Sequence, residues 1–326
     1  MTQSVLLSAQ GLTVSFTGRA RPFAKPDIVR AVDGVDLTIK RGQTLGLVGE
    51  SGCGKSTTGY ALLRLNKGTG RVLFDGVDLM TLPPARLRSM RRRIQIIFQD
   101  AAASLDPRMT IGDLISEALD LHDLHRGPAR MPRVRELLEL VGMPQRFAER
   151  YPHELSGGQA QRIAICRALA VEPELIICDE AVSALDVSIQ AQILNLLQDL
   201  QRRLGLSFLF ISHDLSVVRH ISHEVAVMYL GKIVEQGPTN RLFENPQHPY
   251  TRALLSAVPV PDPDVEKARE RIVLTGDLPN PASPPSGCRF RTRCPVAQPD
   301  CAEILPPLKE VEPDHHAACI FAGRQA

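Results

Sequence analysis

The chain lacks tryptophan, and aromatic residues make up only 4% of its 326 positions. No apolar run approaches the roughly 18 residues that a membrane-crossing helix requires. The N-terminal residues lack the basic start and apolar core of a secretory signal. A formal net charge of +2 is far from the strongly basic balance of a nucleic-acid-binding protein. These absences predict a soluble, cytoplasmic chain that binds no nucleic acid and reaches a membrane only through partners.

The seven cysteines are unevenly distributed, and four of them crowd the last 39 residues: Cys288, Cys294, Cys301 and Cys319. Because the cytosol keeps thiols reduced, this cluster indicates metal ligands before it indicates disulfides. The intervals of 5, 6 and 17 residues lack the close pair that structural zinc favours. An iron–sulfur cluster accepts such irregular spacing, and zinc and unmetallated thiols stay open beside it.

A glycine-rich octapeptide, Gly49 to Ser56, fits the GxxxxGKS phosphate-binding pattern. It lies between an apolar strand predicted over 44–48 and a helix predicted over 57–65, whose N-terminus faces the phosphates. In this pattern Lys55 reaches the β- and γ-phosphates and Ser56 holds Mg²⁺. The residues predicted to surround the phosphates of a bound nucleotide are Gly49, Ser51, Gly52, Cys53, Gly54, Lys55, Ser56 and Thr57. We interpret Cys53 as a permitted small residue rather than a reactive group.

Short apolar strands alternate with helical patterns along most of the chain. Strands are predicted over 94–98, 175–178 and 207–211, and apolar residues recur at helical spacing from 189 to 204. This alternation predicts an α/β fold with a mainly parallel sheet, whose ligands bind at the carboxyl ends of the strands. Four polar residues lie just past predicted strand ends: Lys55, Gln99, Asp179 and His213.

An acidic pair, Asp179-Glu180, ends one of these strands. Asp179 suits a carboxylate that holds the water shell of Mg²⁺, and Glu180 is the candidate general base for in-line attack of water on the γ-phosphate. The alternative is an acidic pair that merely caps the next helix.

Composition changes near residue 257, because twelve of the 25 prolines fall between Pro259 and Pro313. We predict an ATPase domain over 1–256, with a small antiparallel sheet from strands over 5–16 and 29–40. Its helical subdomain spans about 100–160, with breaks at Pro128, Pro132 and Pro144. The loop-rich region 257–326 is predicted to be a second domain that needs a staple to hold its fold.

The pentapeptide Leu155-Ser156-Gly157-Gly158-Gln159 decides the family. With the phosphate loop and the strand ending at Asp179-Glu180, it resembles the ATP-binding cassette (ABC) family. The resemblance implies a RecA-like parallel core with a small antiparallel β subdomain and a helical subdomain. It also implies a head-to-tail dimer in which Ser156, Gly157, Gly158 and Gln159 close over ATP bound by the opposite subunit, with Asp186 at the interface.

Three further roles follow from this resemblance. Gln99 matches the glutamine that touches Mg²⁺ or water, and His213 matches the switch histidine at the γ-phosphate. Phe16 is our choice for the aromatic ring stacked on adenine, with Phe23 as competitor and a core phenylalanine as the plain alternative. The chain departs from the family pattern at Ala101 and Ala181, where proline is usual.

The segments Asn245 to Thr251 and Gly287 to Pro295 resemble the C-terminal extension of dipeptide/oligopeptide importer ATPases. The segment Asp179 to Asp186 resembles the second of the two non-identical ATPases of that subfamily. The resemblance implies a peripheral subunit at the cytoplasmic face of the plasma membrane. Its implied partners are a second ATPase, two permeases and an extracytoplasmic binding protein. A 4Fe–4S cluster on the four clustered cysteines is also implied. The imported solute stays open among dipeptides, oligopeptides, glutathione, nickel and sugars.

Two other classes compete. A soluble ABC-type ATPase acting on nucleic acids or ribosomes usually carries two cassettes, whereas this chain has one copy of each motif. A regulatory binder that does not hydrolyse ATP is opposed by the presence of Glu180 and His213. We therefore expect a transport ATPase that hydrolyses ATP.

Overall fold

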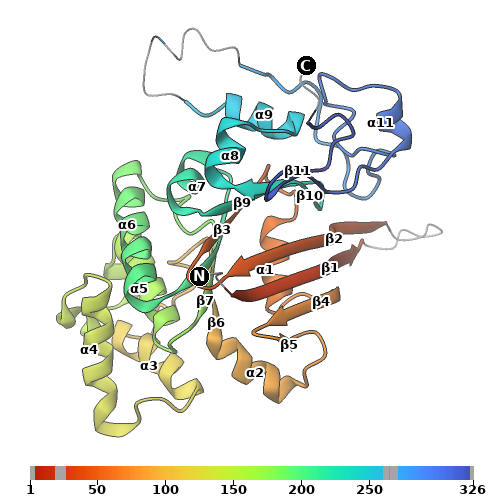
Figure 1. The fold of residues 1–326 in the computed structure, drawn as a ribbon. Helices are drawn as coiled ribbons and strands as arrows, with labels where there is room; N and C mark the ends of the chain where they lie inside the picture. The colour runs from red at the N-terminus through yellow and green to blue at the C-terminus, as the bar shows by residue number, and fades with distance from the viewer. Residues whose placement is uncertain (1–3, 19–26, 260–263, 265–270, 324–326) are drawn as a thin grey trace. The chain divides into compact units, whose positions relative to one another are not determined.

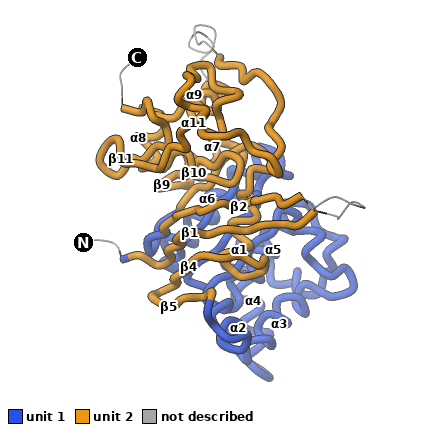
Figure 2. The backbone as a smooth tube through the Cα atoms, turned by 90° about the vertical axis from the view of Figure 1, so that its right-hand side faces the viewer, with its two compact units in different colours: residues 1–4, 39–44, 81–211 blue, residues 5–38, 45–80, 212–326 orange. Residues whose placement is uncertain are grey.

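The computed structural model describes residues 4–18, 27–259, 264 and 271–323. The chain forms two compact units, shown in different colours in Figure 2. Unit 1 comprises residues 1–4, 39–44 and 81–211, and unit 2 comprises residues 5–38, 45–80 and 212–326. The units divide the chain differently from the domain boundary that we expect near residue 257, and that boundary stays a prediction.

Unit 1 contains a run of parallel strands in the order β8-β7-β6. Strand β6 spans Ile94–Ile97, β7 spans Leu175–Asp179 and β8 spans Ser207–Ser212, which confirms the three predicted strands to within one residue. All five residues of β7 are buried, as expected for a strand covered on both faces.

The helices of unit 1 follow the predicted periodicity. Helix α6 (Val187–Leu204) buries apolar residues along one face and ends at Gly205, whose φ of 67° gives the expected left-handed C-cap. Helix α5 (Gly157–Leu169) packs against α6 and β6. Helix α2 (Pro84–Arg93) leads directly into β6.

The helical region between β6 and α5 contains one departure from expectation. It holds α3 (Ile111–Leu121), α4 (Arg130–Leu140) and short 3₁₀ segments over Gly127–Ala129, Gln145–Glu149 and Pro152–Glu154. The predicted break at Pro132 is wrong, because Pro132 is the third residue of α4. The first four N–H groups of a helix have no intrahelical partner, so proline costs little there.

Unit 2 begins with the predicted small antiparallel sheet. Strands β1 (Val5–Thr17), β2 (Ile28–Lys40), β4 (Thr69–Phe74) and β5 (Val77–Asp78) lie in the order β2-β1-β4-β5. Strands β1 and β4 are antiparallel, with Leu7 opposite Phe74. Helix α1 (Lys55–Leu62) packs on β1. It begins two residues before the predicted start and ends three before the predicted end, and Arg64 then takes a left-handed conformation.

A second run of strands in unit 2 has the order β11-β12-β10-β9-β3. Strand β3 (Thr44–Val48) is parallel to β9 (Glu224–Tyr229), which pairs antiparallel with β10 (Lys232–Pro238). The C-terminal region adds β12 (His315–Ala317) and β11 (Lys309–Glu312). Around these strands lie α7 (Leu215–Ile221), α8 (Thr239–Glu244), α9 (Pro249–Ser256) and α11 (Asp300–Glu303) (Figure 1). Among the described residues, no helix is long and apolar enough to cross a bilayer.

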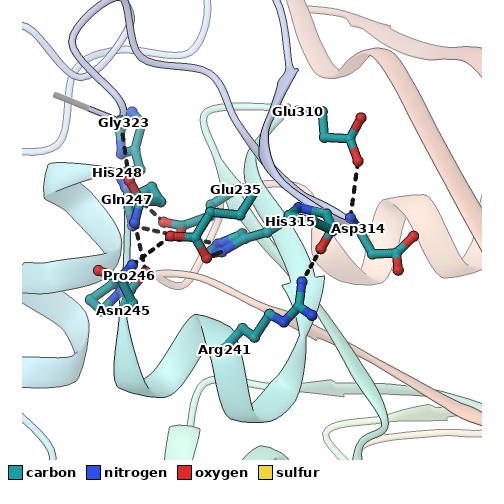
Figure 3. A network of polar contacts seen from close by, with 12 residues as sticks. Glu235, Arg241, Asn245, Pro246, Gln247, His248, Glu310, Asp314, His315 and Gly323 are labelled. Carbon is teal, nitrogen blue, oxygen red and sulfur yellow. Dashed lines mark hydrogen bonds and ion pairs between the residues drawn. The ribbon is translucent and has the colours of Figure 1, made fainter.

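A buried carboxylate ties the C-terminal strand to this sheet (Figure 3). Glu235 on β10 is fully buried and accepts the backbone N–H groups of Gln247 at 2.7 Å and His248 at 2.8 Å. Its carboxylate also lies 2.8 Å from Nε2 of His315 on β12. Three segments of the chain therefore meet at the Glu235 side chain. Burial of this carboxylate is tolerated because each of its oxygens has a protein partner in place of water.

We expect Glu235→Gln to lower the free energy of unfolding by about 3 kcal/mol, because an amide has one accepting oxygen and turns its NH₂ toward the N–H donors. Urea unfolding followed by circular dichroism measures the loss. The matched control is Glu310→Gln, whose exposed carboxylate accepts only the Asp314 N–H in this network, and we expect a change within about 0.5 kcal/mol. Equal losses in the two variants would contradict the assignment.

Candidate functional site

The phosphate loop of unit 2 joins β3 to α1. The Nζ of Lys55 donates to the carbonyl oxygens of Gly49 at 2.8 Å and Glu50 at 3.0 Å, so the loop curls around a buried ammonium group. Gly54 is the N-cap of α1 with φ 112°, and a Cβ there would lie 2.1 Å from the carbonyl oxygen of Ala31. Only glycine fits, and it lets the loop lead into a helix N-terminus, where N–H groups and the helix dipole favour an anion.

Cys53 lies inside this loop but is only 1% exposed. Burial raises the pKa of its thiol to about 11, against the lowering effect of the Lys55 charge. The backbone instead carries the structural role of the residue, because its carbonyl accepts the Gly231 N–H at 2.8 Å. This geometry supports the interpretation of Cys53 as a packing residue.

In unit 1 the structure brings together two of the residues singled out in the sequence. The Nε2 of Gln99, which follows β6, donates to Oε2 of Glu180 at 2.9 Å. Glu180 has φ 47°, a left-handed conformation that costs a residue other than glycine roughly 1 kcal/mol or more. Its N–H donates to the Ile211 carbonyl at 3.0 Å, and Asp179 before it is buried at the end of β7. The backbone thus holds Glu180 in an unusual conformation with its carboxylate turned toward Gln99.

The Ser156-Gly157-Gly158-Gln159 segment forms the start of α5. The Ser156 hydroxyl accepts the Gln159 N–H at 3.4 Å, and the Gln159 side chain accepts the Ser156 N–H at 3.0 Å, which together make a capping box. A Cβ on Gly158 would lie 2.6 Å from Cγ2 of Ile189 on α6. The glycine therefore allows the first turns of α5 and α6 to pack closely.

Asp186 performs the same capping function for α6. Its Oδ1 accepts the Ile189 N–H at 2.9 Å and the Ser188 hydroxyl at 2.7 Å. The Ser188 hydroxyl, followed by the backbone N–H of Ile189, holds the pKa of this carboxyl below its usual value. The sequence pattern Asp-Val-Ser-Ile could have revealed this cap before the structure did.

Phe16 and His213 are both exposed in unit 2. Phe16 on β1 is 46% exposed, which argues against the core interpretation and leaves its ring accessible for stacking. Its competitor, Phe23, lies outside the described residues. His213 follows β8, and the next residue, Asp214, caps α7 by accepting the N–H groups of Ser216 and Val217.

The four C-terminal cysteines line one small, mainly apolar cavity in unit 2, which His248 and Phe290 also line. The Cys288 N–H donates to the Cys301 carbonyl at 2.8 Å. Burial, together with the neighbouring thiols of Cys288, Cys319 and Cys301, raises the pKa of Cys294 to about 11. Within the described residues, no three His, Cys, Asp or Glu side chains are placed to hold one metal ion.

Comparison with known proteins agrees with this geometry. Residues 32–183 match the family model for the ABC transporter, and residues 234–301 match the model for the oligopeptide/dipeptide transporter C-terminal region. The oligopeptide transport ATP-binding protein AppF of Bacillus subtilis is 57% identical over 293 residues, covering 89% of this chain and 89% of AppF. The chain belongs to the ABC transporter ATP-binding proteins.

A second relative and a solved structure are also similar to this ABC protein. The oligopeptide transport ATP-binding protein OppF of Escherichia coli (strain K12) is 53% identical over 324 residues, covering 98% of this chain and 96% of OppF. The dimeric structure of the ATP-binding cassette MJ0796 bound to ADP and Pi has a TM-score of 0.62 and 30% identity, covering 72% of this chain and 98% of MJ0796. The expected family, ABC fold and ATPase activity are thereby confirmed.

Sequence reasoning missed the partners of Glu50, the second residue of the phosphate loop in this ABC ATPase. Its N–H donates to the Tyr250 hydroxyl oxygen at 2.9 Å, and its carboxylate accepts both terminal nitrogens of Arg293, at 2.8 and 3.0 Å. Arg293 lies 243 residues further along the chain. Local sequence patterns carry no signal for a contact at that separation.

Because its pKa is about 11, we expect the Cys53 thiol to be roughly one-thousandth ionised at pH 8 and to resist alkylation. Mass spectrometry of the Cys53 peptide during iodoacetamide treatment should show modification at least about tenfold slower than at an exposed reference thiol. Lys67→Cys on the unit 2 surface supplies that reference. Equal alkylation rates at the two thiols would show that Cys53 is an accessible, reactive group.

Proposed function

We propose that the chain hydrolyses ATP to drive import of dipeptides or oligopeptides through membrane permeases. The observation that carries this proposal is the likeness to OppF, an oligopeptide transport ATP-binding protein, along nearly the whole of both chains. The separate match to the oligopeptide/dipeptide transporter C-terminal region supports the same class of solute. Glutathione, nickel and sugars are the alternative solutes that an uptake measurement decides.

Within the phosphate loop, Lys55 binds the β- and γ-phosphates and Ser56 holds Mg²⁺, while the backbone N–H groups of residues 49–54 surround the phosphates. The buried ammonium of Lys55 supports this role, because a positive charge inside a loop of N–H donors makes a strong anion site. The Mg²⁺ ion neutralises the charge that develops on the phosphates. Asp179 would hold the water shell of this ion, and Gln99 would touch the ion or one of its waters.

Glu180 is the general base of hydrolysis. Its carboxylate accepts the proton of the attacking water as the water's oxygen bonds to the γ-phosphorus and the bond to the leaving ADP oxygen breaks. The hydrogen bond from Gln99 supports this role, since it holds one carboxylate oxygen, Oε2, and so orients the whole carboxylate. His213 contacts the γ-phosphate, and the exposed ring of Phe16 stacks on adenine.

The capped N-terminus of α5 is the part of the chain that binds ATP held by another subunit. Ser156, Gly157, Gly158 and Gln159 present a helix N-terminus suited to the γ-phosphate, and Asp186 lies at the adjoining helix start. The dimeric ADP-bound structure of MJ0796 supports a two-subunit arrangement. The partner here is a second, non-identical ATPase, and the pair sits at the cytoplasmic face of the membrane against two permeases served by an extracytoplasmic binding protein.

Cys288, Cys294, Cys301 and Cys319 hold a 4Fe–4S cluster. Support comes from their position around one cavity, which Arg291 also lines, so that its charge would offset an anionic cluster. When bound, such a cluster links four points of a loop-rich segment by strong bonds. Its role is structural, a staple for a region with few regular elements.

We expect Glu180→Gln to keep ATP affinity within about threefold but to lower turnover by a hundredfold or more, because an amide cannot accept the proton of water. The measurement uses the transporter isolated from its native membranes through a tag on this chain. Phosphate release, ATP binding and uptake of a labelled tripeptide into proteoliposomes are compared.

Glu136→Gln is the matched control, since this carboxylate pairs only with Arg133 on the surface of α4 among the contacts described. It should leave all three readings unchanged. Undiminished hydrolysis in Glu180→Gln would remove Glu180 as the base. Isolation of the tagged chain with ribosomal or DNA-repair proteins, and without permeases, would overturn the import function.

We expect Cys288→Ser with Cys294→Ser to abolish the brown chromophore and the iron content of anaerobically purified protein, since two of four ligands are lost. Iron and zinc are measured by mass spectrometry, with absorbance near 400 nm as the second reading. Cys166→Ser, in the buried part of α5, is the control and should keep the iron. Zinc in place of iron, or unchanged iron in the double variant, would show that the cluster assignment is wrong.

A further inference from the structure

Residues in the C-terminal part of unit 2 bond to the phosphate loop at one residue, Glu50. At Glu50 the backbone N–H donates to Tyr250, the carbonyl accepts Lys55 and the carboxylate accepts Arg293. Every polar group of this one loop residue therefore has a partner. The carbonyl also accepts the Cys53 N–H at 3.3 Å, and two of the four partners, Tyr250 and Arg293, lie beyond α8 in the chain.

The ion pair between Glu50 and Arg293 has the geometry of a fixed contact rather than a transient surface pair. Both terminal guanidinium nitrogens bond to the two carboxylate oxygens, at 2.8 and 3.0 Å. The Arg293 side chain is only 9% exposed. Two-point bonding with little water nearby fixes the orientation of the carboxylate and makes the pair stronger than an exposed one.

The segment that carries Arg293 is itself anchored on unit 2. Arg289 pairs with Asp33 and donates to the carbonyl oxygen of Leu230. Phe290 is buried, and its ring centroid lies 5.3 Å from those of both Tyr229 and Tyr250. The same aromatic cluster therefore fixes the tyrosine that binds the Glu50 N–H and the segment that supplies Arg293.

We propose that Arg293 is a positioning residue for ATP binding, which orders the phosphate loop through Glu50. The inference rests on the proposed role of this loop in binding the ATP phosphates. A loop whose N–H groups are already ordered loses less conformational entropy on binding than a loose one. Releasing the Glu50 carboxylate thus weakens ATP binding, while the chemical step, carried by other residues, keeps its rate.

The test is a double-mutant cycle on the tagged transporter, read as KM and kcat for ATP and as ATP affinity. Arg293→Met is expected to raise KM and the dissociation constant about tenfold, with kcat within about twofold. Glu50→Gln, which alters the same pair from the loop side, should have a similar effect. The double variant should be no worse than either single variant, because both remove one interaction.

Arg71→Met is the matched control, since this guanidinium pairs with Asp78 at an exposed site of unit 2 away from the phosphate loop. It should leave KM unchanged, and Arg293→Lys should recover part of the affinity. Additive losses in the double variant, or a fall in kcat with an unchanged KM, would overturn the positioning role of Arg293. If Arg293→Met fails to fold, an unaltered ATP affinity in Glu50→Gln overturns it equally.

Lys55→Ala separates this inference from the proposed function. Loss of ATP binding in Lys55→Ala together with normal ATP affinity in Arg293→Met would keep the phosphate-binding role of the loop and remove only the positioning role of Arg293. Normal ATP binding in Lys55→Ala would instead remove the phosphate-binding role itself.

Discussion

Complete burial of short parallel strands is the constraint on which the rest of this structure depends. Strands β3 and β7 each contain five residues and none of them is exposed. An ionisable side chain inside such a strand would lose its hydration, so charged groups can lie only where the strand ends. The phosphate loop after β3 and the acidic pair at the end of β7 occupy those points. Chemistry at strand ends therefore follows from the hydrophobic core itself.

Local signals were sufficient wherever an element is long or strongly apolar. The strands around residues 94–98, 175–178 and 207–211, the small antiparallel sheet and the Gly205 cap of α6 were all predictable from periodicity and glycine placement. Pro132 was misread because proline breaks a helix interior but fits a first turn, and only a known helix start separates the two cases.

Other features had no local signal. Strands β11 and β12 have four and three residues, too few for a periodic pattern. They form because β12 pairs with β10 and β11 pairs with β12. The left-handed conformation of Glu180 occurs together with a hydrogen bond from its N–H to Ile211, 31 residues further along the chain. Motifs could place Gln99 and Glu180 in the candidate site, but the bond between their side chains required coordinates.

The chain order of unit 2 has a consequence for folding during synthesis. Its segments 45–80 and 212–326 are separated by most of unit 1, and β3 pairs with β9 through Leu47 and Ala226. Such distant pairings form slowly, because closing a long loop precedes any stabilising contact. Residues 81–211 of unit 1 are synthesised before β9. Glu235 is likewise synthesised well before its partner His315. The phosphate loop thus leaves the ribosome well before β9 exists, and β3 stays without that partner while residues 81–211 are made, which exposes its apolar side chains to chaperones.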